Sequence, residues 1–169
     1  MFNKATGIMG LILAFAIPFV NLLGELTGYR TLWPGFFIVL LYFIGKCEKL
    51  TDLKDIVIGG IVGILWSYGA SLLIGLLVPF MGFLAAFTLG VAICVFVFVI
   101  LGDVQPMLFN NYGFIYFLVA GLSPQQKPVE WIAVLLIGGI LFAVLVFGGI
   151  KLFLKPETSQ NQVNDHKAV

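Results

Sequence analysis

Two adjacent amide side chains, Asn110 and Asn111, stand at the start of an apolar stretch in the sequence "MLFNNYGFIYFLVAG". Each amide offers two hydrogen-bond donors and one carbonyl acceptor. At the start of a helix such groups can cap free backbone N–H groups. They can also bind a polar solute, which the positive end of the helix dipole favours. Both interpretations describe binding rather than the making or breaking of bonds.

The sequence contains no arrangement of residues that is typical of a membrane enzyme. Its one histidine, His166, lies in the polar C-terminal stretch, and neither H-E-x-x-H nor G-x-S-x-G occurs. The two cysteines, Cys47 and Cys94, stand alone, so we interpret them as buried thiols without a disulfide or metal role. We therefore expect no enzymatic activity, no cofactor and no bound metal.

The composition predicts that lipid surrounds the chain. Of its 169 residues, 61% are hydrophobic and 10% are charged, and the mean hydropathy is +1.12. A soluble domain that exposed so much apolar surface would aggregate. The net charge is only +1, without the basic patch that nucleic-acid binding requires. We expect the lipid bilayer as a partner, and no nucleic acid.

Apolar runs bounded by charges, proline or glycine predict an all-α, polytopic membrane protein. A spanning helix needs about 20 apolar residues, because its backbone must satisfy its own hydrogen bonds in hydrocarbon. Pro79 and Gly82 separate the third run from the fourth. No A-x-A-like site follows the first run, so we interpret it as a membrane helix and not as a signal peptide. The six predicted segments are 8–24, 33–47, 56–78, 80–101, 109–122 and 129–154.

The basic residues predict the orientation of the segments, because cytoplasmic loops are enriched in Lys and Arg. With the N-terminus inside, only Arg30 and Lys127 of the nine basic residues fall outside. Both termini are therefore expected in the cytoplasm. We expect one transmembrane domain over residues 1–155 and a disordered cytoplasmic tail over 156–169. The basic residues expected inside are Lys4, Lys46, Lys49, Lys54, Lys151, Lys155 and Lys167.

The second half of the chain resembles the first. When Gly35-Phe36 is laid on Gly113-Phe114, Glu25 falls on Asp103. After a shift of one residue, Gly59-Gly60-Ile61 meets Gly138-Gly139-Ile140. The matching residues follow in the same order in both halves, which predicts two repeats, over about 8–78 and 80–154. A unit of three spanning helices reverses its direction on repetition, so the two repeats would be inverted, as is common in transporters and channels.

The corresponding segments 33–47 and 109–122 are both too short to cross a bilayer. Each covers roughly 21–23 Å at about 1.5 Å per residue, against ~30 Å of hydrocarbon. Paired short segments of this kind indicate a solute site, because irregular backbone at membrane depth is tolerated only inside protein or beside a wet cavity. The expected pore residues at the two helix starts are Trp33, Pro34, Gly35 and Phe36, and Asn110, Asn111, Tyr112, Gly113 and Phe114.

Three further polar residues are candidates near the same path. Glu25 and Asp103 occupy equivalent places beside the spans and would draw cations to the outer and inner mouths. Ordinary solvation at the membrane boundary explains both acids equally well. Asn21 in the first segment would lie near the same cavity. Some of the expected pore residues also have simpler explanations. Trp33 can be an interfacial anchor, and Phe36 and Phe114 can face lipid or neighbouring helices.

Small residues recur every fourth position in the third and fourth segments. Small side chains let helix backbones approach closely in lipid, where hydrophobic burial does not drive association. We expect these positions to join the two halves or to join one protomer to another in a homo-oligomer. They are Gly59, Gly63, Ser67, Ser71 and Gly75, followed by Gly82, Ala86, Gly90 and Cys94.

Two families resemble parts of this sequence. The stretches "LWPGF", "GGIVGILWS" and "NNYGFIYFLVAG" resemble domain of unknown function 1097, a family of short bacterial inner-membrane proteins without an assigned activity. That resemblance implies a location in the bacterial inner membrane. The stretch "QPMLFNNYGFIYFLVAG" is similar to the urea-transporter segment in which Asn-Asn-Pro leads into a short pore helix, although Tyr112 replaces the proline. It implies that Asn110, Asn111 and Phe114 line a pore.

These observations predict a channel or facilitator for a small polar solute, such as a urea-like, amide-like or small weak-acid molecule. An ion-coupled transporter is an alternative, but coupling normally uses ionisable residues inside the membrane, and the predicted spans carry them only at their ends. A non-transporting accessory or scaffold subunit is the other alternative. It explains the small-residue positions but not the short segments.

Overall fold

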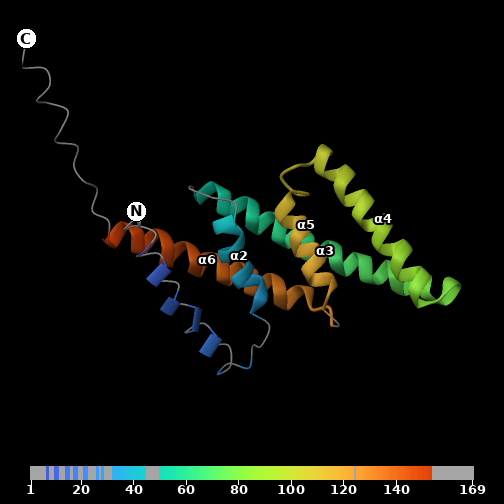
Figure 1. Cartoon of the computed structure of the whole chain (residues 1–169), viewed down its shortest axis with the longest axis horizontal. Coiled ribbons are helices and arrows are strands. Elements are labelled where there is room, and N and C mark those ends of the chain that lie inside the picture. The colour runs from blue at the N-terminus through green and yellow to red at the C-terminus, as the bar shows by residue number, and fades with distance from the viewer. Residues whose placement is uncertain are drawn as a thin grey trace, which may run out of the picture.

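The computed structural model describes residues 32–44, 50–123 and 125–153, together with single positions between residues 7 and 28. These residues form an all-α fold, as expected (Figure 1). The predicted segment 8–24 lies outside the described residues except for those single positions. The five helices are α2 (Trp33–Ile44), α3 (Leu50–Met81), α4 (Phe83–Val104), α5 (Asn111–Gly121) and α6 (Pro128–Phe153).

Three of the five helices are long and apolar enough to cross a membrane. Their candidate spans are Asp52–Met81, Phe83–Val104 and Pro128–Leu145. The other two are short, as predicted: α2 has 12 residues and α5 has 11. The described helices thus identify a membrane protein with three long apolar helices.

The boundary between α3 and α4 differs from the prediction at Pro79. The proline lies inside the last turn of α3, and Gly82 alone separates the two helices. Pro79 cannot donate the hydrogen bond that would join its N–H to the Gly75 carbonyl, and the helix ends two residues later. Gly82 has φ = 77°, a left-handed conformation that glycine adopts at little cost, so the chain reverses there within one residue.

The helices pack around the central pair α3 and α6. The short helix α5 packs on α3, α2 packs on α6, and α4 packs on α3 (Figure 1). The main core forms where these helices meet, and its fully buried side chains include Ile38, Ile56, Tyr116 and Leu135. The core is apolar apart from the polar ends of its aromatic residues.

Glycines allow α3 and α5 to touch through their backbones. A Cβ atom on Gly113 would lie 2.9 Å from the carbonyl oxygen of Gly59, and one on Gly63 would overlap the carbonyl oxygen of Gly113. On α4, Gly90 packs against the side chain of Ile74. The predicted packing role of the small residues is therefore confirmed here. It does not extend to Gly75 or Gly82, where a Cβ would meet no atom within 4 Å.

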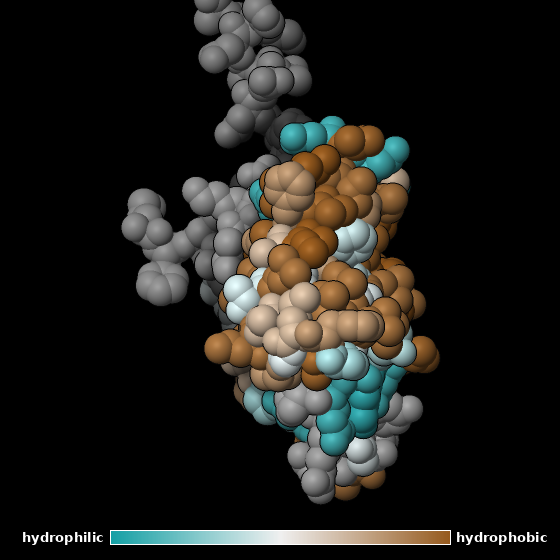
Figure 2. All heavy atoms as spheres, turned by 90° about the vertical axis from the view of Figure 1, so that its right-hand side faces the viewer, coloured by the Kyte–Doolittle hydropathy of each residue, from teal (hydrophilic) through white to brown (hydrophobic). Residues whose placement is uncertain are grey.

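Large apolar side chains project from the outer faces of α3 and α4. Phe80 is 85% exposed, Leu84 79% and Phe96 66%. Figure 2 shows a face covered mostly by hydrophobic residues, with hydrophilic residues gathered towards its two ends. Such a surface suits contact with lipid, with the polar ends at the headgroups.

A first prediction concerns the α3–α5 contact. Gly63→Ala should lower the stability of the protein in detergent by roughly 1–3 kcal/mol, because the added methyl group forces the two backbones apart. Gly75→Ala is the matched control on the same helix and should leave stability unchanged or raise it slightly, since its surroundings are open. Thermal unfolding followed by tryptophan fluorescence measures both. Equal midpoints for the two variants would contradict the described contact.

Candidate functional site at the short helices

Asn110 caps the start of α5 and ties it to α3. Its Oδ1 accepts a hydrogen bond from the backbone N–H of Gly113 at 2.8 Å. Its Nδ2 donates to the carbonyl oxygen of Asp55 in the first turns of α3 at 2.9 Å, and to that of Met107 at 3.3 Å. The capping interpretation of this residue is therefore correct, and its amide is engaged on both sides.

The next three residues have different surroundings. Asn111 is exposed, so its amide is accessible from outside the protein. Tyr112 is half-buried against the main core. Gly113 is buried at the crossing with Gly59. Of the two predicted amides, Asn111 is thus the one whose side chain remains accessible.

The start of α2 has no side-chain cap among the described residues. The backbone N–H groups of Gly35 and Phe36 instead donate to the carbonyl oxygen of Leu32, at 3.2 and 3.4 Å. Pro34 is buried in the first turn, where its lack of an N–H carries no penalty. Phe36 is half-buried.

Trp33 belongs to an aromatic cluster between α2, α5 and α6. Its ring centroid lies 5.7 Å from that of Phe37, 5.9 Å from Tyr116 and 5.5 Å from Trp131. Edge-to-face and offset pairs at such distances stabilise packed aromatic side chains. Trp33 therefore helps to hold three helices together, in addition to any interfacial role.

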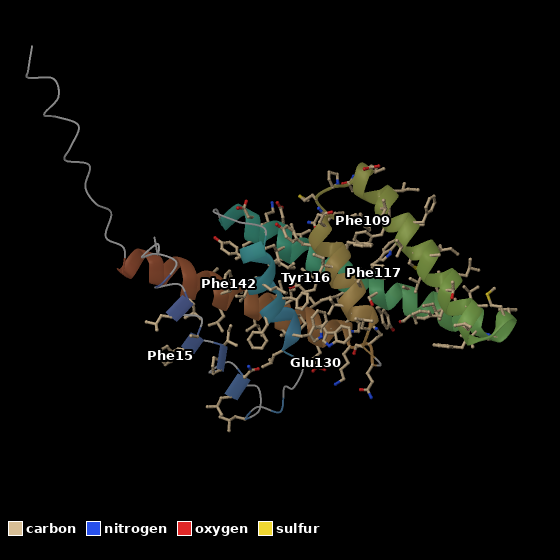
Figure 3. The ribbon with its side chains drawn as sticks, in the orientation of Figure 1. Phe15, Phe109, Tyr116, Phe117, Glu130 and Phe142 are labelled. Carbon is tan, nitrogen blue, oxygen red and sulfur yellow. The ribbon has the colours of Figure 1, made fainter. Side chains whose placement is uncertain are left out.

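Tyr116, which is not among the predicted site residues, joins the two short helices. Its side chain is fully buried, and its hydroxyl donates to the carbonyl oxygen of Pro34 at 2.8 Å. Figure 3 shows the residue in the middle of the protein, between α2 and α5. The space between the predicted pore residues of the two halves thus contains Tyr116 and apolar side chains. The sequence feature that could have identified this residue is a tyrosine in the interior of an otherwise apolar short helix.

Phe114 lies in a second aromatic cluster, away from Phe36. Its ring is 5.7 Å from that of Phe98 and 6.2 Å from that of Phe117. Trp66 completes this cluster from α3, and its Nε1 donates to the carbonyl oxygen of Cys94 on α4 at 3.1 Å. Phe109 also belongs to the cluster, with its ring 5.1 Å from that of Phe98. The cluster fastens α4 and α5 to α3, and Figure 3 labels Phe109 and Phe117.

The remaining candidates lie apart from this site. Asp103 is exposed near the end of α4, and Asn21 is exposed at its single described position. Glu25, Cys47 and His166 lie outside the described residues. Cys94 is a buried free thiol, as predicted. Among the described residues, no group of His, Cys, Asp or Glu is arranged to hold a metal ion.

An apolar groove of about 440 Å³ lies between α3 and α4. Its lining includes the large side chains of Trp66, Leu73 and Ile93 and the small residues Gly69, Ala70 and Cys94. The groove therefore lies beside the second aromatic cluster, away from Asn111 and Trp33.

Comparison with protein-family models, curated proteins and solved structures finds no match for this chain. The resemblances to domain of unknown function 1097 and to urea transporters therefore remain predictions.

A second prediction separates the two asparagines. Asn110→Ala should destabilise the protein by about 1 kcal/mol, the usual effect of losing a helix cap. Asn110→Ser should recover the capping part of that loss, because a serine hydroxyl can accept from the Gly113 N–H, but not the bond to the Asp55 carbonyl. Asn111→Ala should leave stability unchanged, since its side chain is exposed. Thermal unfolding in detergent measures all three, and equal losses for Asn110→Ala and Asn111→Ala would contradict the capping role.

Proposed function

We propose that the protein is a channel or facilitator that passes a small polar solute across a membrane, through two inverted halves. The observation that carries this proposal is a pair of equivalent glycine contacts. Gly113 of α5 packs on Gly59 of α3, and Gly35 of α2 packs on Gly138 of α6, with a Cβ on Gly138 reaching 2.6 Å from the Gly35 Cα. The proposed repeat equates Gly35 with Gly113 and Gly59 with Gly138.

Neighbouring contacts support the same equivalence. A Cβ on Gly60 would lie 3.0 Å from the ring of Tyr116, and one on Gly139 would lie 3.3 Å from the side chain of Ile38. The repeat equates Gly60 with Gly139 and Tyr116 with Ile38. Each short helix thus packs on the long helix of the other half, as expected for a two-fold axis between α3 and α6. Under this proposal α2 and α5 belong to six segments in two inverted three-helix repeats.

Inverted repeats with short, interrupted helices are the architecture in which many transporters build a solute path. In this proposal Asn111 contacts the solute, because the Asn110 amide is already engaged in capping. Trp33, Pro34, Gly35 and Phe36 form the equivalent mouth. Movement of Tyr116 away from the Pro34 carbonyl would open the space between the two mouths.

The charged residues favour passive flow. Among the described residues, the charges of the three long helices lie near helix ends, as Asp52, Lys54 and Asp55 do in α3 and Glu130 does in α6. Ion coupling usually depends on ionisable groups deeper in the membrane. We therefore propose a passive channel or facilitator ahead of an ion-coupled transporter. The proposed setting is the bacterial inner membrane, as a homo-oligomer with both termini in the cytoplasm.

A non-transporting accessory or scaffold subunit is a second candidate, and the closed core favours it. Ile38, Tyr116 and Leu135 are all 0% exposed where the two halves meet. If the protein serves only to hold helices together, this packing is its complete function and the accessible amide of Asn111 has no solute.

A third prediction concerns solute flux, which distinguishes a transport protein from a scaffold subunit. Liposomes that contain the full chain should reswell faster than empty liposomes in urea, formamide, glycerol, acetate or formate, for at least one solute. Asn111→Leu should slow that reswelling severalfold without changing stability, whereas Tyr68→Phe, on the exposed face of α3, should not. If wild type reswells no faster than empty liposomes with every solute, the transport proposal is wrong. Sodium or proton dependence would instead indicate coupling.

The inverted topology yields a fourth prediction. If α5 crosses the membrane despite its 11 residues, then Lys54 and Gln125 lie on opposite sides. Both are exposed, so Lys54→Cys and Gln125→Cys can be introduced separately in a chain with Cys47 and Cys94 replaced by alanine. An impermeant thiol reagent added to oriented vesicles should label the two positions from opposite sides. Labelling from the same side would exclude the inverted arrangement.

A further inference from the structure

The groove of about 440 Å³ between α3 and α4 is open to the surroundings of the protein. Two of its lining side chains, Leu65 and Ile93, are 50% and 42% exposed. Gly69 also lines it, and a Cβ atom there would meet no atom within 4 Å. A volume of this size is typical of sites that bind small molecules. Three properties of the groove determine its occupant: its depth along the helices, its polarity and its width.

The groove lies well inside the apolar spans of both helices. Its lining on α3 runs from Val62 to Leu73, within the candidate span Asp52–Met81. At about 1.5 Å per residue, Val62 lies roughly 10 Å along the axis from Asp55, and Leu73 lies roughly 12 Å from Met81. The part of α4 that lines the groove lies within the span of that helix as well. When α3 spans a bilayer, the groove therefore faces hydrocarbon, which contains no water to fill it.

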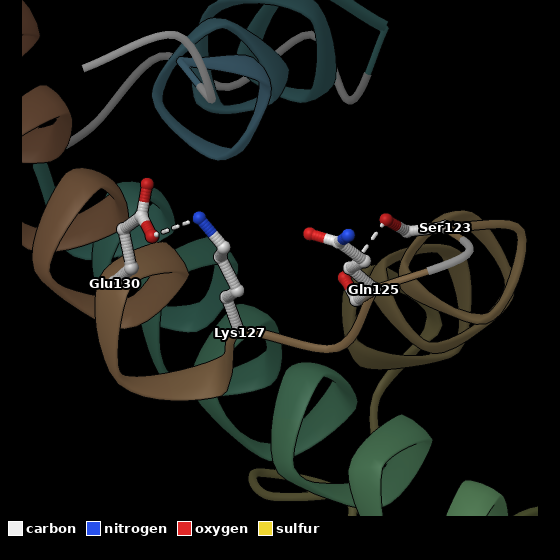
Figure 4. Close-up of polar contacts among 4 residues, drawn as sticks. All are labelled: Ser123, Gln125, Lys127 and Glu130. Atoms are coloured by element: carbon white, nitrogen blue, oxygen red, sulfur yellow. Dashed lines mark hydrogen bonds and ion pairs between the residues drawn. The ribbon is translucent and has the colours of Figure 1, made fainter. Parts of the chain in front are cut away.

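The lining offers no unpaired side-chain N–H or O–H group to a polar ligand. None of its residues is charged, and its only side-chain N–H, that of Trp66, already donates to a backbone carbonyl of α4 at 3.1 Å. Polar side chains gather elsewhere, such as beside the loop between α5 and α6. There Lys127 pairs with Glu130 at 3.1 Å (Figure 4). The groove therefore suits an apolar occupant.

The two helices touch at both ends of the groove, so it is narrow. Towards the Gly82 turn, a Cβ atom on Gly90 would lie 2.6 Å from the side chain of Ile74. Towards the other end, the ring centroids of Trp66 and Phe98 lie 5.9 Å apart. A helix with its side chains is about 10–12 Å across, so it cannot enter between two helices in contact. A single hydrocarbon chain can enter, because carbon atoms pack at separations of only about 4 Å.

We propose that this groove binds one acyl chain of a membrane lipid. The chain would lie over the small residues Gly69, Ala70 and Cys94, with the ring of Trp66 beside it. Figure 1 shows the hairpin of α3 and α4 projecting beyond the other described helices, which leaves it open to lipid. The bound chain would supply dispersion contacts that the two helices lack at this level. The site lies away from Asn111, so this inference goes beyond the proposed transport function and does not depend on it.

Trp66 can report the bound chain, because bromine atoms on a lipid quench the fluorescence of a tryptophan that they contact. The test titrates the full chain in detergent with phosphatidylcholine brominated midway along its acyl chains. Quenching should reach a plateau, since one site saturates. Bromines next to the headgroup should quench less, because the groove begins roughly 10 Å from the charged end of α3. Trp33 and Trp131 lie in the other aromatic cluster and give a background that all variants share.

Gly69→Leu should abolish the saturable quenching, because the leucine side chain occupies the groove. Gly75→Leu is the matched control on the same helix. A Cβ atom at Gly75 also meets no atom within 4 Å, but this glycine does not line the groove, so quenching should saturate as in wild type. Both variants should fold, since both positions are open. Trp66→Phe removes the reporter, and the saturable quenching should disappear with it.

Several results would overturn the acyl-chain site. One is saturable quenching that is equal in wild type and Gly69→Leu, or that persists in Trp66→Phe. Another is wild-type quenching without a plateau, which would indicate ordinary contact with surrounding lipid. Dissociation of an oligomer by Gly69→Leu, measured by light scattering, with quenching unchanged would show that a second copy covers the groove. Each result leaves the Asn111 flux experiment unaffected, so the transport proposal stands or fails separately.

Discussion

Helices in a membrane gain little from hydrophobic burial against one another, because lipid is as apolar as their side chains. They stay together only where their surfaces approach closely enough for dispersion forces and hydrogen bonds to act. In this protein the approach is made by glycines, at Gly59 and Gly113 on one side and at Gly35 and Gly138 on the other. The Asn110 bond to the Asp55 carbonyl and the Tyr116 bond to the Pro34 carbonyl both depend on that separation.

The short helix α5 illustrates how irregular chain is tolerated beside apolar helices. Before it, the N–H groups of Leu108 and Phe109 both donate to the Gln105 carbonyl, and Asn110 caps the first turn. After it, the side-chain amide of Gln126 bonds the Ala120 carbonyl. The protein therefore supplies from its own side chains and turns the hydrogen bonds that water would supply elsewhere.

Much of the fold could be predicted from hydropathy and glycine spacing. The five described helices lie close to the predicted segments, and the two short ones are short in the structure. Pro79 was misinterpreted as a boundary, because sequence alone does not show that a proline in a last helical turn is tolerated. The capping role of Asn110 was one of the two predicted interpretations, but its bond to the Asp55 carbonyl and the bond of Tyr116 to the Pro34 carbonyl could not be predicted, since these partners lie far away in the sequence. An aromatic residue in an apolar run looks the same whether it faces lipid or bridges two helices.

The one-residue turn at Gly82 has a consequence for biogenesis. It leaves no polar linker between α3 and α4 that could remain on the far side of the membrane while the two helices entered singly. A turn this tight fits insertion of the two helices as one hairpin, in which Gly90 packs against Ile74. The 11-residue helix α5 is too short to partition into lipid alone. The glycine face of α3, on which α5 packs, would then serve as its assembly template.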